Sequence, residues 1–204
     1  MAFSIRPATV EDADFIIGAF DSVIPVLIAA GNSGQWGTQL FSEKEGFADS
    51  MRDDLVQSER FRTTGEGERI RIFIAESRSE RVAFFTVRER HFSQHVSALG
   101  ALKRYVDEAE SLPGGYLYID VLIADQRARN RKGSGAALID YAESYTRDMG
   151  AKDIYVDCWS GGDGKLAQYY HDAGFKSIAP IAFTKKDGSI WPGILMRMQL
   201  DDSS

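Results

Sequence analysis

The part of the sequence that most restricts the fold is an apolar run followed by a glycine-containing turn and a helical pattern. Residues 116–124, YLYIDVLIA, are bulky and β-branched almost throughout, which is typical of a central strand covered on both faces. The turn RNRKGSG at 129–135 leads into 135–150, where apolar residues recur at helical spacing. Because strand, turn and helix follow one another, we expect an α/β fold built around this segment.

The remaining sequence predicts further strands and helices around this segment. The strands are expected at 3–9, 69–77, 81–90, 153–160 and 193–200, and the helices at 10–30, 43–60, 93–112 and 164–174. Pro25 is expected to break or kink the first helix. Since no repeat or linker is visible, residues 1–204 are expected to form a single domain with a mixed sheet and helices on both faces.

Composition excludes several classes of function. The chain has 24 Lys and Arg against 30 Asp and Glu, a net charge of −6, which argues against a nucleic-acid partner. The single cysteine excludes an internal disulfide. The three histidines include one i,i+4 pair, His91 and His95, but have no acidic or Cys neighbours at ligand spacing, so no metal is expected. Neither a signal peptide nor an apolar run that spans a bilayer is visible, so we expect a cytoplasmic protein with no membrane partner.

The glycine turn has the features of a phosphate-binding site. The first N–H groups of the following helix have no partners within it and point out of its positive N-terminal end. Gly133 and Gly135 allow a ligand to approach the backbone closely. Positive charge is supplied by Arg127, Arg129, Arg131 and Lys132. The expected ligand therefore carries a phosphate or a pyrophosphate.

Three kinds of phosphate site use such a turn, and two of them do not fit. A Walker A loop requires Lys directly after its last glycine, which neither Gly133 nor Gly135 has. The dinucleotide motif GxGxxG requires glycine where Leu138 stands. The third pattern, [Q/R]xxGx[G/A], belongs to sites for the pyrophosphate of coenzyme A. NRKGSG matches it at both glycines and departs from it at Asn130.

With this turn, the sequence resembles the GNAT acyltransferase family. Two segments carry the resemblance: YIDVLIADQRARNRKGSGAAL at 118–138, and LAQYYHDAGFKS at 166–177, which is similar to the family's xxxYYxxxGF ending. The resemblance implies a central sheet splayed at its middle strands, with acetyl-CoA as cosubstrate and the pantetheine arm between those strands. It also implies these cofactor-binding residues: Leu122, Ile123 and Ala124 for pantetheine, and Arg129, Arg131, Lys132, Gly133, Ser134, Gly135 and Ala136 around the pyrophosphate. Asp163 stands where the family often has an asparagine, and an Asp there can instead cap the helix at 164.

Two residues are candidates for the proton transfers that acyl transfer requires. Tyr170 matches the family tyrosine that stands beside the sulfur and serves as general acid, although a core aromatic at this position is the alternative. Asp120 lies in the middle of the central strand and is a candidate general base, with a structural Asp or a water chain as alternatives. Cys158 is expected to be a small buried thiol rather than an acyl-carrying nucleophile.

Two tryptophans are candidates for the acceptor site. Trp36 lies in the glycine-rich loop 31–39, where it either faces the acceptor or anchors the loop, and Trp159 ends a strand beside the expected gap.

The function expected is transfer of an acetyl group from acetyl-CoA to the primary amine of a small molecule, by direct attack. The alternatives are another acyl donor, a protein or peptide acceptor, or an inactive module of the same fold that binds coenzyme A. A nucleic-acid patch at RARNRK, 127–132, fits poorly because no aromatic residues are interleaved. The protein is expected to be a monomer or a homodimer.

Overall fold

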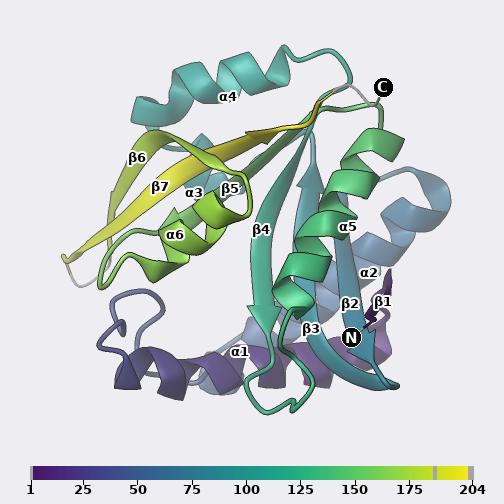
Figure 1. Ribbon diagram of the computed structural model, residues 1–204, viewed down its shortest axis with the longest axis vertical. Helices are drawn as coiled ribbons and strands as arrows, with labels where there is room; N and C mark the ends of the chain where they lie inside the picture. Colours follow the sequence, from purple (N-terminus) through teal and green to yellow (C-terminus); the bar gives the residue numbers. More distant parts are fainter. Residues whose placement is uncertain (1, 186–187, 202–204) are drawn as a thin grey trace. The chain divides into compact units, whose positions relative to one another are not determined.

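The computed structural model describes residues 2–185 and 188–201, and within them seven strands form one mixed sheet (Figure 1). The strand order is β1-β2-β3-β4-β5-β7-β6. The strands are β1 (Ser4–Pro7), β2 (Ile70–Ser77), β3 (Glu80–Glu89), β4 (Tyr116–Ala124), β5 (Asp153–Trp159), β6 (Lys176–Thr184) and β7 (Ile190–Gln199). The predicted α/β class and mixed sheet are confirmed.

The described helices lie between these strands along the chain, singly or in pairs. They are α1 (Ala13–Ala29), α2 (Phe47–Thr64), α3 (Gln94–Ser97), α4 (Lys103–Glu110), α5 (Ser134–Asp148) and α6 (Lys165–Asp172). Short 3-10 helices lie at Val10–Asp12, Phe41–Glu43 and Gly100–Leu102. None of the helices described is both long enough and apolar enough to cross a membrane.

The chain divides into two compact units. The first unit comprises Met1–Val87 and Val121–Tyr141, and the second comprises Arg88–Asp120 and Ala142–Ser204. The elements β3, β4 and α5 are continuous and contribute residues to both units. The expectation that residues 1–204 act as one domain stays a prediction.

In the first unit, α1 and α2 pack beside β2, the strand that forms a hairpin with β3. β1 is antiparallel to β2, from Ser4 opposite Glu76 to Pro7 opposite Phe73. The turn after β2 consists of Arg78 and Ser79, which have φ values of 53° and 66°. Two consecutive left-handed residues are what a tight hairpin turn of the right twist requires, so this hairpin forms without glycine.

In the second unit, β5 pairs with β4 on one side and with β7 on the other. β4 and β5 are parallel, and their register runs from Tyr116 opposite Asp153 to Ile119 opposite Val156. β4 continues to Ala124 and β5 to Trp159, so each strand extends beyond the shared ladder. This end of the ladder is where a sheet splayed at its middle strands is expected to open.

Two predictions about helices need correction. Pro25 does not break α1, which continues to Ala29; the proline lacks only one N–H, and Ile24 beside it is buried in the core. The single helix predicted at 93–112 is two helices, α3 and α4, joined by the 3-10 turn at Gly100–Leu102. Gly100 favours this interruption because glycine loses more conformational entropy than other residues when it is ordered in a helix.

Candidate functional site

The glycine turn of the first unit ends in unsatisfied donors. Gly133 has a φ of 90°, a conformation that favours glycine, and α5 begins at the next residue. Its carbonyl accepts the N–H of Ala137 at 3.1 Å. Among the described residues, no acceptor bonds the backbone N–H groups of Gly135 and Ala136. The Ser134 Oγ is buried and also has no partner within the described chain.

This arrangement favours a bound anion. A buried hydroxyl without a partner costs free energy unless a ligand or water completes its hydrogen bond. Ser134 places such a hydroxyl at the start of a helix, where the dipole and two open N–H groups favour an anion. The cofactor-binding assignment of Gly133 to Ala136 stays a prediction, and the local geometry is compatible with it.

The basic residues of the turn fall into two groups. Arg127 donates from Nε and Nη2 to the Asp125 carboxylate, both at 2.9 Å, so its charge is already paired. A Cβ on Gly18 would lie 2.6 Å from the Arg127 guanidinium, so glycine in α1 makes room for this pair. Arg131 donates to the carbonyl of Ala128 at 2.9 Å.

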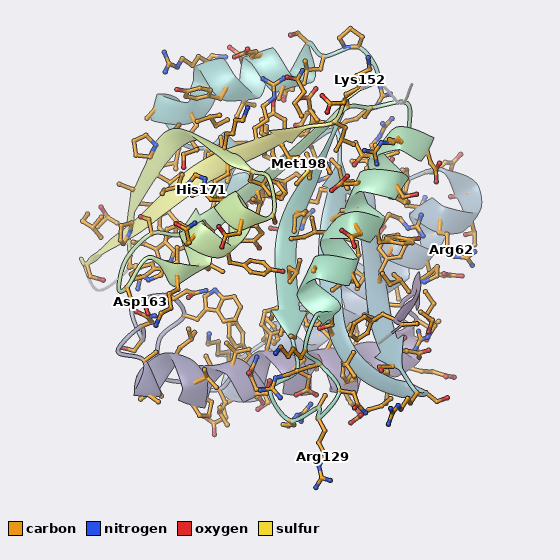
Figure 2. The ribbon with its side chains drawn as sticks, viewed as in Figure 1. Arg62, Arg129, Lys152, Asp163, His171 and Met198 are labelled. Carbon is orange, nitrogen blue, oxygen red and sulfur yellow. The ribbon has the colours of Figure 1, made fainter. Side chains whose placement is uncertain are left out.

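Arg129 and Lys132, by contrast, are exposed. Figure 2 shows Arg129 extending away from the ribbon. These two side chains are therefore more available to a bound phosphate than Arg127.

The β4 residues predicted to bind pantetheine lie beyond the β4–β5 ladder. Leu122 and Ala124 are half-buried, and Ile123 is buried. The carbonyl of Ala124 accepts a hydrogen bond from Gln126 Nε2 at 2.9 Å. Their contact with a pantetheine arm stays a prediction.

Tyr170, the predicted general acid, lies in α6 of the second unit. Its ring is buried and packs edge-on against Phe175 and Tyr169, with centroids 5.5 and 5.4 Å away. None of the described residues bonds to its hydroxyl. Burial raises the pKa of Tyr170 well above its ordinary value. The hydroxyl is therefore protonated at neutral pH and can donate a hydrogen bond.

Asp120, the predicted general base, is bound in an ion pair. Its Oδ2 lies 2.7 Å from Arg88 Nε, and both side chains are largely buried. Arg88 Nη1 also lies 3.3 Å from His91 Nε2. The pair is consistent with the alternative of a structural Asp, and the role of base stays a prediction.

Cys158 is a buried free thiol, as expected from the sequence. Burial, with the charge of Asp157, raises its pKa to about 12. Its Sγ lies 3.7 Å from the Sδ of Met196. A thiol in these surroundings forms very little thiolate at neutral pH, which argues against an acyl-cysteine intermediate.

Trp36 is a partly buried member of the core of the first unit. Its ring lies 5.7 Å from Phe20 and 5.5 Å from Phe41. These are the contacts of a loop anchor, and a role at the acceptor stays a prediction.

Trp36→Ala is therefore expected to lower the free energy of unfolding, by less than the about 3–5 kcal/mol typical of a fully buried Trp. If Trp36 also lines the acceptor site, the KM of the acceptor rises more than that of acetyl-CoA. Steady-state kinetics at a temperature where the variant is folded measure both, with Trp36→Phe as the control. Equal KM changes would leave Trp36 as an anchor only.

Trp159 ends β5 and offers an unpaired donor. It is 9% exposed, and its indole Nε1 has no partner within the described chain. Its ring packs against Trp191 at 5.6 Å, and Trp191 stacks on Phe183 at 4.7 Å. A Cβ on Gly161 would lie 2.3 Å from the Trp159 ring, so glycine is needed there. The substrate-binding role predicted for Trp159 stays a prediction.

Asp163 behaves as a helix-capping residue. Its Oδ1 accepts the backbone N–H of Lys165 at 3.2 Å, and its Oδ2 pairs with the Lys165 ammonium at 2.6 Å. Gly164, with a φ of 69°, is the N-cap itself.

Sequence reasoning missed a polar network of the second unit. His95 lies 3.3 Å from both oxygens of Asp157, although the two residues are 62 positions apart. Ser93 and Tyr118 complete the network. No local motif signals it, because it depends on bringing α3 to β4 and β5. Among the described residues, no group of three or more His, Cys, Asp or Glu side chains could hold a metal ion.

No family model and no curated protein matches the chain. Solved structures match along its length. yncA from Salmonella typhimurium, solved with its cofactor acetyl-CoA, is 16% identical, with a TM-score of 0.61 over 100% of this chain and 97% of yncA. An acetyltransferase of the GNAT family from Listeria monocytogenes is 18% identical, with a TM-score of 0.62 over 97% and 95% of the two chains.

A third match is the ribosomal-protein-alanine N-acetyltransferase from Brucella melitensis. It is 15% identical, with a TM-score of 0.60 over 97% of this chain and 99% of that chain. At these identities the comparison establishes the fold. The chain therefore has the fold of the GNAT acetyltransferases, as its sequence motifs predict.

Proposed function

We propose that the protein is an acetyl-CoA-dependent N-acetyltransferase that acetylates a primary amine of a small molecule. The observation that carries this proposal is the start of α5 in a GNAT fold. There the buried hydroxyl of Ser134 and the N–H groups of Gly135 and Ala136 have no partner among the described residues and can bind an anion. The structurally similar protein yncA was solved with acetyl-CoA, which supports the same cosubstrate here.

In this proposal the first unit supplies the groups that hold coenzyme A. The N–H groups of Gly135 and Ala136 and the hydroxyl of Ser134 bind the pyrophosphate. The exposed Lys132 and Arg129 add charge for the ribose phosphate. The backbone of β4 at Leu122 to Ala124 pairs with the amides of the pantetheine arm, as an added strand would.

The second unit supplies the proton donor. The departing thiolate of coenzyme A must gain a proton. The Tyr170 hydroxyl is protonated and has no hydrogen-bond partner among the described residues, so it can donate this proton. The acetyl group passes directly from the thioester to the amine, because the chain's single thiol, Cys158, is buried with a raised pKa. A backbone N–H of the 122–124 segment would stabilise the negative oxygen that forms during attack.

Binding of acetyl-CoA is expected to raise the melting temperature. A ligand at 100 times its Kd stabilises a protein by about 2.7 kcal/mol. For a chain of this size that corresponds to a rise in Tm of about 5–10 °C. Dephospho-CoA should give a smaller rise if Lys132 and Arg129 contact the ribose phosphate. Absence of any shift at millimolar acetyl-CoA would contradict the proposal.

The acceptor is tested by release of free coenzyme A with a panel of amines, amino acids, aminoglycosides and peptides. Activity with small amines supports the proposal, whereas activity only with peptides would make the acceptor a protein. A clear melting shift without turnover of any acceptor would favour an inactive module that binds coenzyme A. The thermal shift and the turnover assay therefore distinguish the two alternatives.

A further inference from the structure

The second unit contains a hydrogen-bonded network that the proposed acid and cofactor site do not use. Tyr118 on β4 donates its hydroxyl hydrogen to Oδ1 of Asp157 on β5. His95 Nε2 lies 3.3 Å from both Asp157 oxygens. Ser93 Oγ lies 2.9 Å from His95 Nδ1 and 3.0 Å from the Tyr118 hydroxyl. The four side chains thus form a closed set around one imidazole.

Burial divides this network into a fixed carboxylate and an accessible imidazole. The Asp157 side chain is 7% exposed, whereas that of His95 is 44% exposed. Tyr118 is fully buried. A buried carboxylate that bonds one ring nitrogen orients the imidazole and stabilises its protonated form, which is how an orienting group acts on a general base.

The charges around His95 favour uptake of a proton. Burial lowers the pKa of His95, but the hydrogen bond and charge of Asp157, with the charge of Asp120, outweigh it and raise the pKa above 6.5. The charge of Arg88 acts against this rise.

The network can satisfy both charge states of the imidazole. In the neutral state, Nε2–H donates to Asp157 and Nδ1 accepts the Ser93 hydroxyl. In the protonated state, Nδ1–H donates to Ser93, whose hydroxyl then turns to the oxygen of Tyr118 at 3.0 Å. No donor or acceptor is left unpaired in either state, so gain and loss of the proton cost little reorganisation.

The network also interacts electrostatically with the proposed acid. Burial raises the pKa of Tyr170, and the charge of Asp157 adds to this rise. Asp120, the base predicted from the sequence, has Oδ2 paired with Arg88 at 2.7 Å and is less exposed than His95. His95 is therefore the better placed of the two side chains to receive a proton from a substrate.

We propose that His95 is the general base that deprotonates the acceptor amine, and that Asp157 is its positioning residue. This inference rests on the proposed function. In the step, an N–H bond of the substrate ammonium breaks as its proton passes to the Ser93 hydroxyl oxygen, and the Ser93 O–H proton passes to Nδ1 of His95, 2.9 Å away. The electron pair left on the nitrogen attacks the thioester, and His95 later releases the proton to water. The acceptor is then an amine that is cationic at neutral pH, such as a primary alkylamine.

The pH profile of kcat/KM tests this assignment. In the parent, the rate falls as the pH falls through the pKa of His95, because only the neutral imidazole accepts a proton. Asp157→Asn should move this limb to lower pH, because the negative charge that raises the pKa is lost while burial remains. His95→Gln should remove the limb and lower kcat/KM by about 10²–10⁴-fold for the best alkylamine of the panel. His171→Gln, at a histidine bonded to the carbonyl of Phe175, is the matched control and should keep the parental profile.

A second acceptor separates base catalysis from structural damage. Hydroxylamine is uncharged at neutral pH and needs no base, so His95→Gln should lower its acetylation by less than about tenfold. Equal loss with both acceptors, or an unchanged acid limb in His95→Gln, would overturn the inference. Loss of the limb in Asp120→Asn but not in His95→Gln would assign the base to Asp120 instead. If the parent protein shows neither a melting shift with acetyl-CoA nor turnover, the proposed function is contradicted, and this inference is contradicted with it.

Discussion

Gly135→Asp is expected to abolish binding of acetyl-CoA while leaving the protein folded. The new carboxylate would lie beside the open N–H groups at the start of α5, in the place assigned to the pyrophosphate. The same charge interacts favourably with the helix N-terminus, by about 0.3–1 kcal/mol. The melting temperature without ligand should therefore hold or rise slightly, and the shift with acetyl-CoA should disappear.

Two matched variants show whether the charge is responsible. Gly135→Asn has nearly the same size without the charge and should weaken binding less than Gly135→Asp. Ser144→Asp adds the same charge at an exposed position of α5 and should keep the full melting shift. Should Gly135→Asp bind acetyl-CoA as tightly as the parent, the pyrophosphate does not lie on this turn.

Tyr170→Phe is expected to lower kcat by about 10–10³-fold, which is near the usual contribution of one acid. The KM of acetyl-CoA should change far less, because a proton donor acts mainly in the transition state. Stability should change little, since phenylalanine keeps the ring contacts with Phe175 and Tyr169 and the hydroxyl has no partner among the described residues. The measurement is steady-state kinetics under conditions where chemistry limits turnover.

The pH dependence and a neighbouring tyrosine provide the controls for Tyr170. Burial raises the pKa of Tyr170, so the hydroxyl stays protonated as the pH rises past 10.0, the ordinary value. The ratio of parent to variant rates should therefore be constant from neutral pH to pH 9. Tyr169→Phe changes the more exposed neighbour and should keep the parental kcat. An unchanged kcat in Tyr170→Phe would remove the assigned role.

The central part of the fold could be predicted because its signals are local. β4 has the bounds expected from its continuous apolar run, and α5 begins within one residue of the predicted start. The glycine at position 133 is explained by the backbone, because the chain takes a positive φ there, directly before the helix. The motif therefore states both the backbone conformation and the open donors that follow from it.

The polar network around His95 and the pairing of Arg127 could not be predicted in the same way. His95 and Asp157 are 62 positions apart, so their contact depends on the sheet rather than on any local pattern. The sequence predicts that the charge of Arg127 binds a ligand. In the structure its guanidinium is paired with the nearby Asp125, and the lack of a side chain at Gly18 leaves room for this pair. Charge counts in a turn give no information about which side chains are already paired.

The buried thiol makes Cys158 a built-in reporter of opening motions. The chain has one cysteine, and a pKa raised to about 12 reduces its thiolate fraction by about 10³-fold relative to an exposed thiol. Slow reaction with a thiol reagent therefore measures how often β5 leaves its neighbours. The same reagent can count released coenzyme A with little background from the folded protein. A ligand that slows labelling of Cys158 would then report its own binding as protection of the second unit, without any turnover.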